Sequence, residues 1–327
     1  ENFEPGGDPA YHGTGGPLNV SNLRSPNPFC QVFVRAAEEV GIPANPDFNG
    51  AQQEGVGLYH VTIKDGQRWS TAAAYLRAAE ARQNLTVLTG AHVARIEIVD
   101  GVATGVELIR GGKRETLKAN REVILSAGAI NSPQLLMLSG VGPSEELARH
   151  GIAVKHALPG VGQNLQDHLD ILIVHKATQP VSYGFTLGTF RRMFKAMLEY
   201  RRSGTGLLSS NGTEAGGFAR SRPELAVPDL QFHLTLIKLD EHGKSLRFAI
   251  GHGYSLHVCN LRPKSRGYVA LADANPLTPP RIQPNYLVEP EDMEQMVAAV
   301  KLGRRVLGAD AFASYRGDEI FPGPQVR

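Results

Sequence analysis

The chain has 327 residues, of which 42% are hydrophobic and 20% charged, a composition typical of a folded globular protein of about two domains. The formal net charge of +2 argues against a nucleic-acid-binding surface, and no apolar run reaches the roughly 18 residues of a membrane span. Only Cys30 and Cys259 could pair, and they lie far apart, so we expect a reducing, cytoplasmic compartment. The first residues resemble neither a signal peptide nor a natural start.

The first half of the sequence predicts two helices. The first spans residues 28–40, because Asn27 can cap it, Pro28 suits its first position and Gly41 suits its end. Its apolar side chains at helical spacing predict a buried face. The second helix follows Ser70, which can cap it.

Strand patterns dominate the next region. Residues 92–99 alternate in polarity, Asp100-Gly101 is a strong hairpin turn and residues 102–109 return, which predicts an antiparallel β-meander. Residues 85–89 predict a short strand before it. Residues 122–129 contain a continuous apolar run, typical of a strand buried on both faces, and a helix is expected to begin near Ser132. A buried strand, a small-residue turn and a helix start indicate the cofactor approach of a doubly wound sheet.

The second half predicts a different domain. Residues 170–177, 230–237, 254–261 and 268–271 read as strands of an antiparallel sheet, and a long helix is expected near 291–307. A basic, amphipathic helix is expected over 186–202. Its apolar side predicts packing against the core, with a membrane surface as the alternative. The apolar residues of this helix are Phe190, Met193, Phe194, Met197 and Leu198, and the basic ones are Arg191, Arg192, Lys195, Arg201 and Arg202.

One segment carries a family resemblance. Residues 128–142, GAINSPQLLMLSGVG, match every constrained position of a signature of the glucose–methanol–choline (GMC) oxidoreductases, and blocks along the whole chain resemble the same family in order. The resemblance is closest to choline dehydrogenases and related bacterial alcohol dehydrogenases. It implies FAD as the cofactor, with the backbone of Val93 against the adenine and with Ala127 and Gly128 beside the adenosine part. The alternative for Val93 is an ordinary core residue.

The resemblance also implies that two parts of such an enzyme are not in this sequence. None of the glycine clusters forms the Gly-x-Gly-x-x-Gly turn that holds a pyrophosphate. The His-Pro-x-Gly-Thr block with the family's catalytic His is also missing, so we expect no catalytic residue here. The sequence therefore predicts an internal piece of an enzyme that oxidises a primary alcohol to the aldehyde by hydride transfer to flavin, a piece inactive alone.

Three further groups of polar residues each allow a functional and a structural interpretation. By resemblance Glu214 faces the trimethylammonium group of a choline-like substrate, and the alternative is a solvated strand-edge carboxylate. Asp167-His168 is expected to link domains rather than to catalyse. We expect no metal site, since the spacing of the remaining candidates fits no known motif and favours alternation along strands. These candidates are His233, His252, His257 and Cys259.

The predicted fold class is α/β: a partial doubly wound FAD-binding domain with an inserted β-meander, plus an α+β substrate domain with an antiparallel sheet. Residues 1–50 and 169–327 are expected to form the substrate domain, and residues 51–168 the incomplete FAD-binding domain. Expected partners are a small alcohol and an unidentified electron acceptor, with a quinone, a homodimer and peripheral contact at the inner membrane left open. The rival functions are an oxygen-using oxidase of the same family and a non-catalytic binding domain.

Overall fold

The computed structural model describes residues 1–186, 188–238 and 250–326. The chain divides by its internal packing into two compact units. Unit 1 comprises Glu1–Leu85, His168–Arg262 and Met293–Arg327, and unit 2 comprises Thr86–Asp167 and Pro263–Asp292. The functional boundaries that we predict after residues 50 and 168 stay predictions.

Unit 1 is built on a six-stranded, fully antiparallel sheet with the strand order β18-β12-β15-β14-β13-β3. The sequence predicts three of its strands, over residues 170–177, 230–237 and 254–261, and these predictions are confirmed. The strands are β3 (Gly55–Leu58), β12 (Asp170–Ala177), β13 (Thr213–Ala219), β14 (Leu230–Thr235), β15 (Gly253–Asn260) and β18 (Arg316–Phe321).

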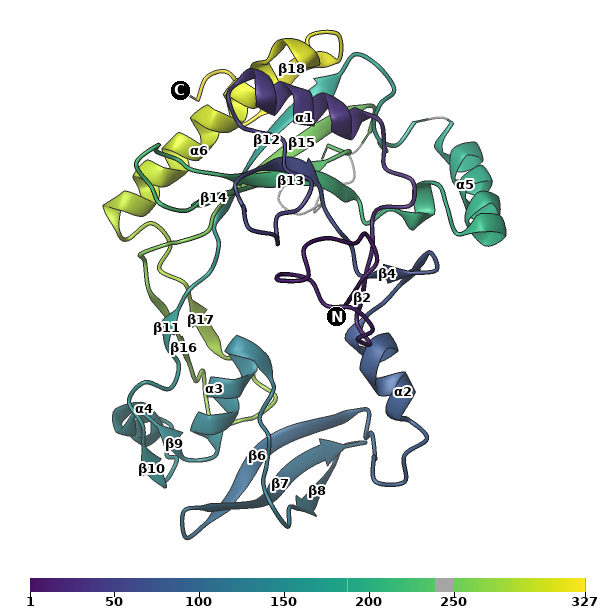
Figure 1. Ribbon diagram of the computed structural model, residues 1–327. Helices are drawn as coiled ribbons and strands as arrows, with labels where there is room; N and C mark the ends of the chain where they lie inside the picture. Colours follow the sequence, from purple (N-terminus) through teal and green to yellow (C-terminus); the bar gives the residue numbers. More distant parts are fainter. Residues whose placement is uncertain (187, 239–249, 327) are drawn as a thin grey trace. The chain divides into compact units, whose positions relative to one another are not determined.

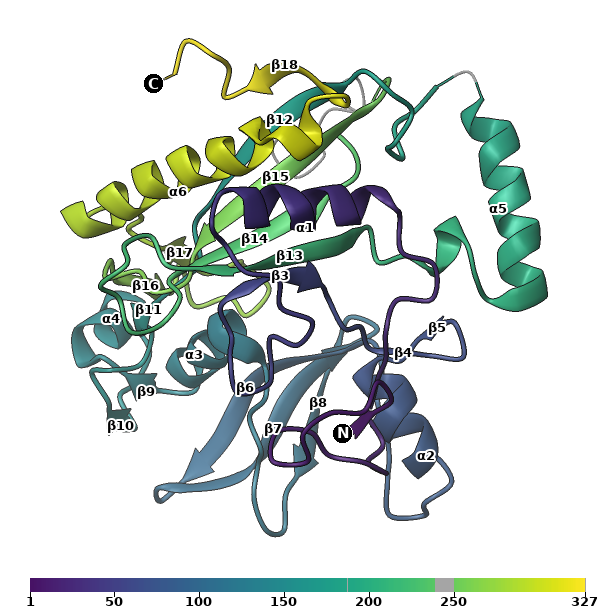
Figure 2. The same ribbon diagram turned by 45° about the horizontal axis from the view of Figure 1, so that its top comes forward.

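Two helices cover one face of this sheet, α1 (Phe29–Glu39) and α6 (Pro290–Gly308), as Figures 1 and 2 show. The main hydrophobic core lies beneath them, where Phe33 packs edge-to-face against Phe232 and both side chains are fully buried. The two helices lie side by side, and Arg305 of α6 donates a hydrogen bond to the Val40 carbonyl at the end of α1. Along β14, the core residues Leu230, Phe232 and Leu234 alternate with Gln231, His233 and Thr235, which give the opposite face its polar side chains.

The boundaries of α1 follow from its sequence. Asn27 accepts a hydrogen bond from the Phe29 N–H at its Oδ1, which satisfies one of the donors at the start of the helix. Gly41 ends the helix at φ +92°, a conformation that side chains disfavour. The predicted apolar face is confirmed as buried, and it consists of Phe29, Val32, Phe33 and Ala36.

The remaining elements of unit 1 are short apart from α5 (Thr189–Ser203). The predicted helix after Ser70 is present as a π-helical turn that runs into α2, and the Ser70 Oγ accepts a hydrogen bond from the Ala73 N–H. These short elements are β1 (Asn2–Phe3), β2 (Asn19–Val20), β4 (Ile63–Lys64), β5 (Gln67–Arg68), the π-helical turn Ala72–Leu76, α2 (Arg77–Ala79), and the 3-10 turns Leu207–Ser209 and Asp310–Phe312.

Unit 2 contains the predicted meander, in the order β6-β7-β8, and a second three-stranded sheet, β11-β16-β17. Asp100 and Gly101 both have positive φ, as the two-residue hairpin requires. The elements of unit 2 are β6 (Ala91–Val99), β7 (Val102–Arg110), β8 (Lys113–Lys118), α3 (Gly128–Leu138), β9 (Val141–Gly142), α4 (Ser144–Arg149), β10 (His156–Ala157), β11 (Gln163–Leu165), β16 (Gly267–Ala270) and β17 (Arg281–Gln283).

Two predicted strands, over residues 85–89 and 122–129, do not form. Residues 85–89 and 122–126 have no strand pairing, and Ile124 is 77% exposed. A strand of this apolar type needs a hydrogen-bonded neighbour on each side and a layer on each face. None of the described residues supplies those neighbours, so the apolar run of residues 122–126 does not form a strand.

The structure contradicts the prediction that the apolar side of α5 packs against the core. The helix forms as expected and ends at Gly204 in the left-handed conformation. Its apolar side is not packed against the core, however, because five apolar side chains of the helix are substantially exposed. These are Phe190, Met193, Phe194, Met197 and Leu198. Among the described residues, no helix is long and apolar enough to span a membrane.

Candidate functional site

A cavity of about 450 Å³ lies in unit 2 between the start of β6, the start of α3 and the loop of residues 276–280. Val93 of β6 and Ala127, directly before α3, line the same cavity. The structure therefore brings two of the predicted flavin-contact residues together. Gly128 lies next to Ala127 and has φ +80°, with open space where a side chain would begin.

Hydrogen bonds fix two walls of this cavity. The Nε2 of His92 lies 2.9 Å from the Pro276 carbonyl, and the Gln134 amide donates to the Thr278 carbonyl at 2.9 Å. Apolar side chains such as Leu135 and Leu277 complete the lining. A cavity of this size, with a mostly apolar wall and a few polar groups, suits a heteroaromatic group such as an adenine.

The start of α3 differs from the prediction. The helix begins at Gly128, so Ser132 lies inside it and does not cap it. Ala127 stands at the N-cap position without a side-chain cap, which leaves the first N–H groups of the helix without a side-chain acceptor there. Gly128 can adopt its positive φ only because it has no Cβ.

In unit 1, Glu214 is completely buried, so the solvated strand-edge interpretation is wrong. Its carboxylate accepts four hydrogen bonds from four separate positions of the chain. The Oε1 atom accepts from the Tyr183 hydroxyl at 2.9 Å and the Ser210 hydroxyl at 2.5 Å. The Oε2 atom accepts from the Asn27 N–H at 2.5 Å and from the Cys30 thiol at 3.6 Å. A buried carboxylate with this many donors is well compensated.

The Glu214 carboxylate affects two of its donors in turn. Burial, together with the nearby negative charge of Glu214, raises the pKa of the Cys30 thiol and of the Tyr183 hydroxyl well above their usual ranges. Both groups therefore stay protonated at neutral pH and act as donors. Neither is poised as a nucleophile or a base.

A second cavity, of about 550 Å³, adjoins this cluster in unit 1. Ser210 lines the cavity and donates its hydroxyl to Glu214, so the carboxylate lies one residue behind the cavity wall. The lining also includes His60, Arg68 and Tyr200. Sequence reasoning missed this cavity, because its residues come from three distant segments with no shared motif.

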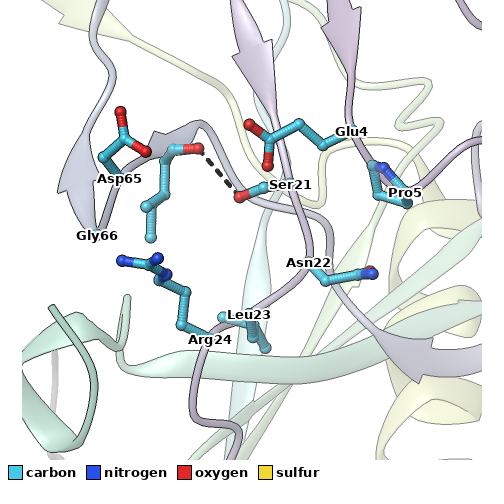
Figure 3. A pocket seen from close by; sticks show the side chains of 9 residues that line it. Glu4, Pro5, Ser21, Asn22, Leu23, Arg24, Asp65 and Gly66 are labelled. Carbon is cyan, nitrogen blue, oxygen red and sulfur yellow. Dashed lines mark hydrogen bonds between the residues drawn. The ribbon is translucent and has the colours of Figure 1, made fainter. Parts of the chain in front are cut away.

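A third, more polar cavity of about 340 Å³ also lies in unit 1 (Figure 3). The carboxylates of Glu4 and Asp65 and the guanidinium of Arg24 surround it. The Ser21 hydroxyl donates to the Ile63 carbonyl at 3.0 Å and ties the residue after β2 to β4 beside the cavity. The wall of this cavity therefore carries both signs of charge.

The polar face of the six-stranded sheet holds three of the four residues that the sequence raised as metal candidates, His233, His257 and Cys259. The fourth, His252, precedes β15, and its Nδ1 lies 3.3 Å from the Ser182 hydroxyl. His257 Nδ1 lies 2.6 Å from a carboxylate oxygen of Asp170, which orients the imidazole ring. The Cys259 thiol lies 3.8 Å from His233, and burial raises its pKa to about 12. Among the described residues, no group of three or more His, Cys, Asp or Glu side chains is arranged to hold a metal ion.

The comparisons with known proteins place the chain in a family. Models of the GMC oxidoreductases match residues 4–170 and residues 263–327. The chain belongs to the GMC oxidoreductase family. The predicted α/β fold class is confirmed by the solved members of the family. The chain has a TM-score of 0.82 to pyridoxine 4-oxidase from Mesorbium loti, at 27% identity, covering 98% of this chain and 59% of that one. Its TM-score to a formate oxidase is 0.83, at 25% identity, covering 95% and 59% of the two chains.

Curated relatives are similar over almost the whole chain. An alcohol dehydrogenase [acceptor] from Pseudomonas putida is 47% identical over 97% of this chain and 57% of its own length. An oxygen-dependent choline dehydrogenase from Rhizobium johnstonii is 44% identical over 98% of this chain and 58% of its own length. The chain therefore spans somewhat more than half the length of these relatives.

Proposed function

We propose that this chain is part of an FAD-dependent enzyme that oxidises a primary alcohol to the aldehyde. The observation that carries the proposal is the 47% identity to an alcohol dehydrogenase over 97% of the chain. The cavity lined by Val93 and Ala127 supports it, because its position agrees with the flavin contacts that the family resemblance implies. When bound, FAD supplies the acceptor for the hydride of the alcohol.

The residues of unit 2 would bind and orient the adenosine part of the cofactor. Val93 and Ala127 both line the cavity, and Gly128, next to Ala127, has open space where a side chain would begin. Gln134 and His92 hold the loop of residues 276–280 in place as the remaining wall. Because Val93, Ala127 and Gly128 are small or apolar, their part is to shape the cavity rather than to react.

Glu214 is proposed to act on the substrate side. Its negative charge favours a cationic alcohol such as choline. All four of its hydrogen bonds come from the chain itself, and Ser210 lies between its carboxylate and the 550 Å³ cavity. A cationic substrate in this cavity would therefore interact with the charge of Glu214 across Ser210 and not by direct contact. A neutral primary alcohol is the alternative substrate. An oxygen-using oxidase remains the second candidate function, since a choline dehydrogenase relative is named as oxygen-dependent.

The experiment uses protein expressed from the complete gene and compares Ala127→Phe with Ala153→Phe. Ala153 is an exposed alanine of unit 2 that lines none of the cavities described above. A phenyl ring at position 127 would fill the cavity, so we expect flavin content and flavin affinity to fall at least tenfold, while Ala153→Phe keeps both. Equal flavin content in the two variants would refute the assignment of this cavity to FAD.

A further inference from the structure

The helix α5 is attached to unit 1 through one of its faces only. Arg192 donates hydrogen bonds to the carbonyls of Tyr183 and Gly184 at 3.0 Å each and to that of Ser182 at 3.3 Å. Ala196 is buried, and the Tyr200 hydroxyl donates to the Gly66 carbonyl at 2.9 Å. Residues 192, 196 and 200 are spaced by four and share a face. In Figures 1 and 2 the helix stands beside the sheet of unit 1, not over either face of it.

A second face of α5 is apolar and exposed to solvent. We define the apolar strip as Phe190, Phe194, Met197 and Leu198, which follow the spacing of one helix face. Their side chains are 86%, 53%, 39% and 52% exposed. At 3.6 residues per turn, the centre of this strip lies about 145° around the helix from the centre of the attached face. The attachment of α5 therefore turns its most apolar surface away from the protein.

A row of basic side chains borders the apolar strip. Arg191, Lys195 and Arg202 are exposed and lie at helical spacing between the strip and the attached face, with Arg201 at the end of the strip. The helix contains five basic side chains against the single carboxylate of Glu199, which gives it a net charge of +4. The whole chain has a net charge of only +2, so the positive charge is concentrated on this helix.

We propose that α5 binds an anionic lipid surface, with the apolar strip inserted at the headgroup boundary and the basic row against the lipid phosphates. A helix with exposed aromatic and aliphatic side chains on one face and Lys and Arg beside them has the composition of an interfacial helix. Anionic headgroups attract such a cluster. A second copy of the chain fits less well, since a two-fold contact through this strip would bring the two basic rows together.

The test measures sedimentation of the full-length protein with phosphatidylcholine vesicles that contain or lack phosphatidylglycerol. We expect binding to the anionic vesicles that weakens as salt is raised, and little binding to the neutral ones. Replacing the basic row in R191Q/K195Q/R202Q should weaken binding roughly a hundredfold, at about fivefold per charge. F190S/F194S should weaken binding at least about tenfold, because both rings leave water on binding.

Matched controls carry the same changes elsewhere on the surface. V227S/V288S removes two exposed apolar side chains, and K118Q/R121Q/R222Q removes three exposed charges. Both controls should bind anionic vesicles like the unchanged protein. Equal binding by F190S/F194S and its control, or equal binding to neutral and anionic vesicles, would overturn the proposal. So would loss of a dimer in F190S/F194S without any change in vesicle binding, because a second copy would then occupy the strip.

The flavin assignment does not enter this proposal, and the two can fail separately. F190S/F194S should keep the flavin content of the unchanged protein, since α5 lies in unit 1 and the cavity lined by Ala127 lies in unit 2. Loss of both flavin and vesicle binding in F190S/F194S would indicate misfolding, which circular dichroism detects. In that case the vesicle binding of R191Q/K195Q/R202Q tests the lipid proposal instead.

Discussion

The buried carboxylate of Glu214 provides the sharpest stability prediction. In Glu214→Ala the Asn27 N–H loses its acceptor, as do the hydroxyls of Tyr183 and Ser210, and a cavity is left among fully buried residues. In Glu214→Gln the carbonyl oxygen can keep the bond from the Asn27 N–H. The amide group then faces the two hydroxyls, which can turn to accept from it.

The two variants should lower the free energy of unfolding of unit 1 by different amounts. Each buried donor without a partner costs about 1–3 kcal/mol, so we expect Glu214→Ala to lower the free energy of unfolding of unit 1 by about 3–5 kcal/mol. Glu214→Gln keeps the number of hydrogen bonds but makes them neutral. Since charge-assisted bonds are roughly twice as strong as neutral ones, its cost should be about 1–2 kcal/mol.

The assay is urea denaturation followed by the fluorescence of Trp69. This residue is the only tryptophan of the chain and belongs to unit 1, where its indole N–H donates to the Pro17 carbonyl at 2.8 Å. The control is Glu224→Ala, which removes an exposed carboxylate and should change the free energy by less than about 0.5 kcal/mol. A cost for Glu214→Ala below about 1 kcal/mol would refute the view that this carboxylate joins three segments of unit 1, residues 27–30, Tyr183 and residues 210–214.

Two further predictions concern close packing and pH. In Gly216→Ala the new methyl group would collide with the Tyr59 ring and a backbone carbonyl, so urea denaturation should show a loss of about 1–3 kcal/mol, whereas Gly188→Ala, at an open position, should cost little. His12 lies 2.7 Å from Asp47, and this hydrogen bond raises the pKa of His12. Burial alone would raise the pKa of Asp47, but the hydrogen bonds from His12 and the Asn49 N–H, together with the positive charges of His12 and His60, outweigh burial and lower that pKa. The stability gained from the pair should be lost as pH rises through the raised pKa of His12, and again as pH falls through the lowered pKa of Asp47. Denaturation of His12→Gln across pH measures this, and a difference from the unchanged protein that is independent of pH contradicts it.

Local patterns predicted the elements whose stabilising contacts are local. The helix α1 begins and ends where Asn27 and Gly41 place its boundaries, because caps and left-handed glycines act within a few residues. The meander forms for the same reason, since Asp100 and Gly101 fix the hairpin register.

The patterns failed where the outcome depends on distant neighbours. The apolar residues around Ile124 predict a strand buried on both faces, yet nothing in the described chain pairs with them. The apolar side of α5 was expected in the core, but the hydrogen bonds of Arg192 and Tyr200 attach the opposite side of the helix. Hydrophobic periodicity shows that a helix has an apolar face, and it does not show what that face contacts.

For the candidate sites too, the sequence predicted some features and not others. The resemblance selected Val93 and Ala127, which lie in different elements and line one cavity. It also selected Glu214, but no sequence pattern indicates that four donors surround its carboxylate. Ser210 lies four residues before Glu214, but Tyr183 and Asn27 belong to other segments, and only the folded chain brings these two within hydrogen-bond distance of Glu214.

The visible absorption spectrum of the protein expressed from its complete gene tests the central claim most directly. The spectrum is recorded without oxygen, before and after the addition of choline and, separately, of a simple primary alcohol. We predict a flavin band that bleaches with at least one of the two substrates, as hydride transfer to bound FAD requires. A colourless protein, or a flavin band that neither alcohol changes, would contradict the proposed function.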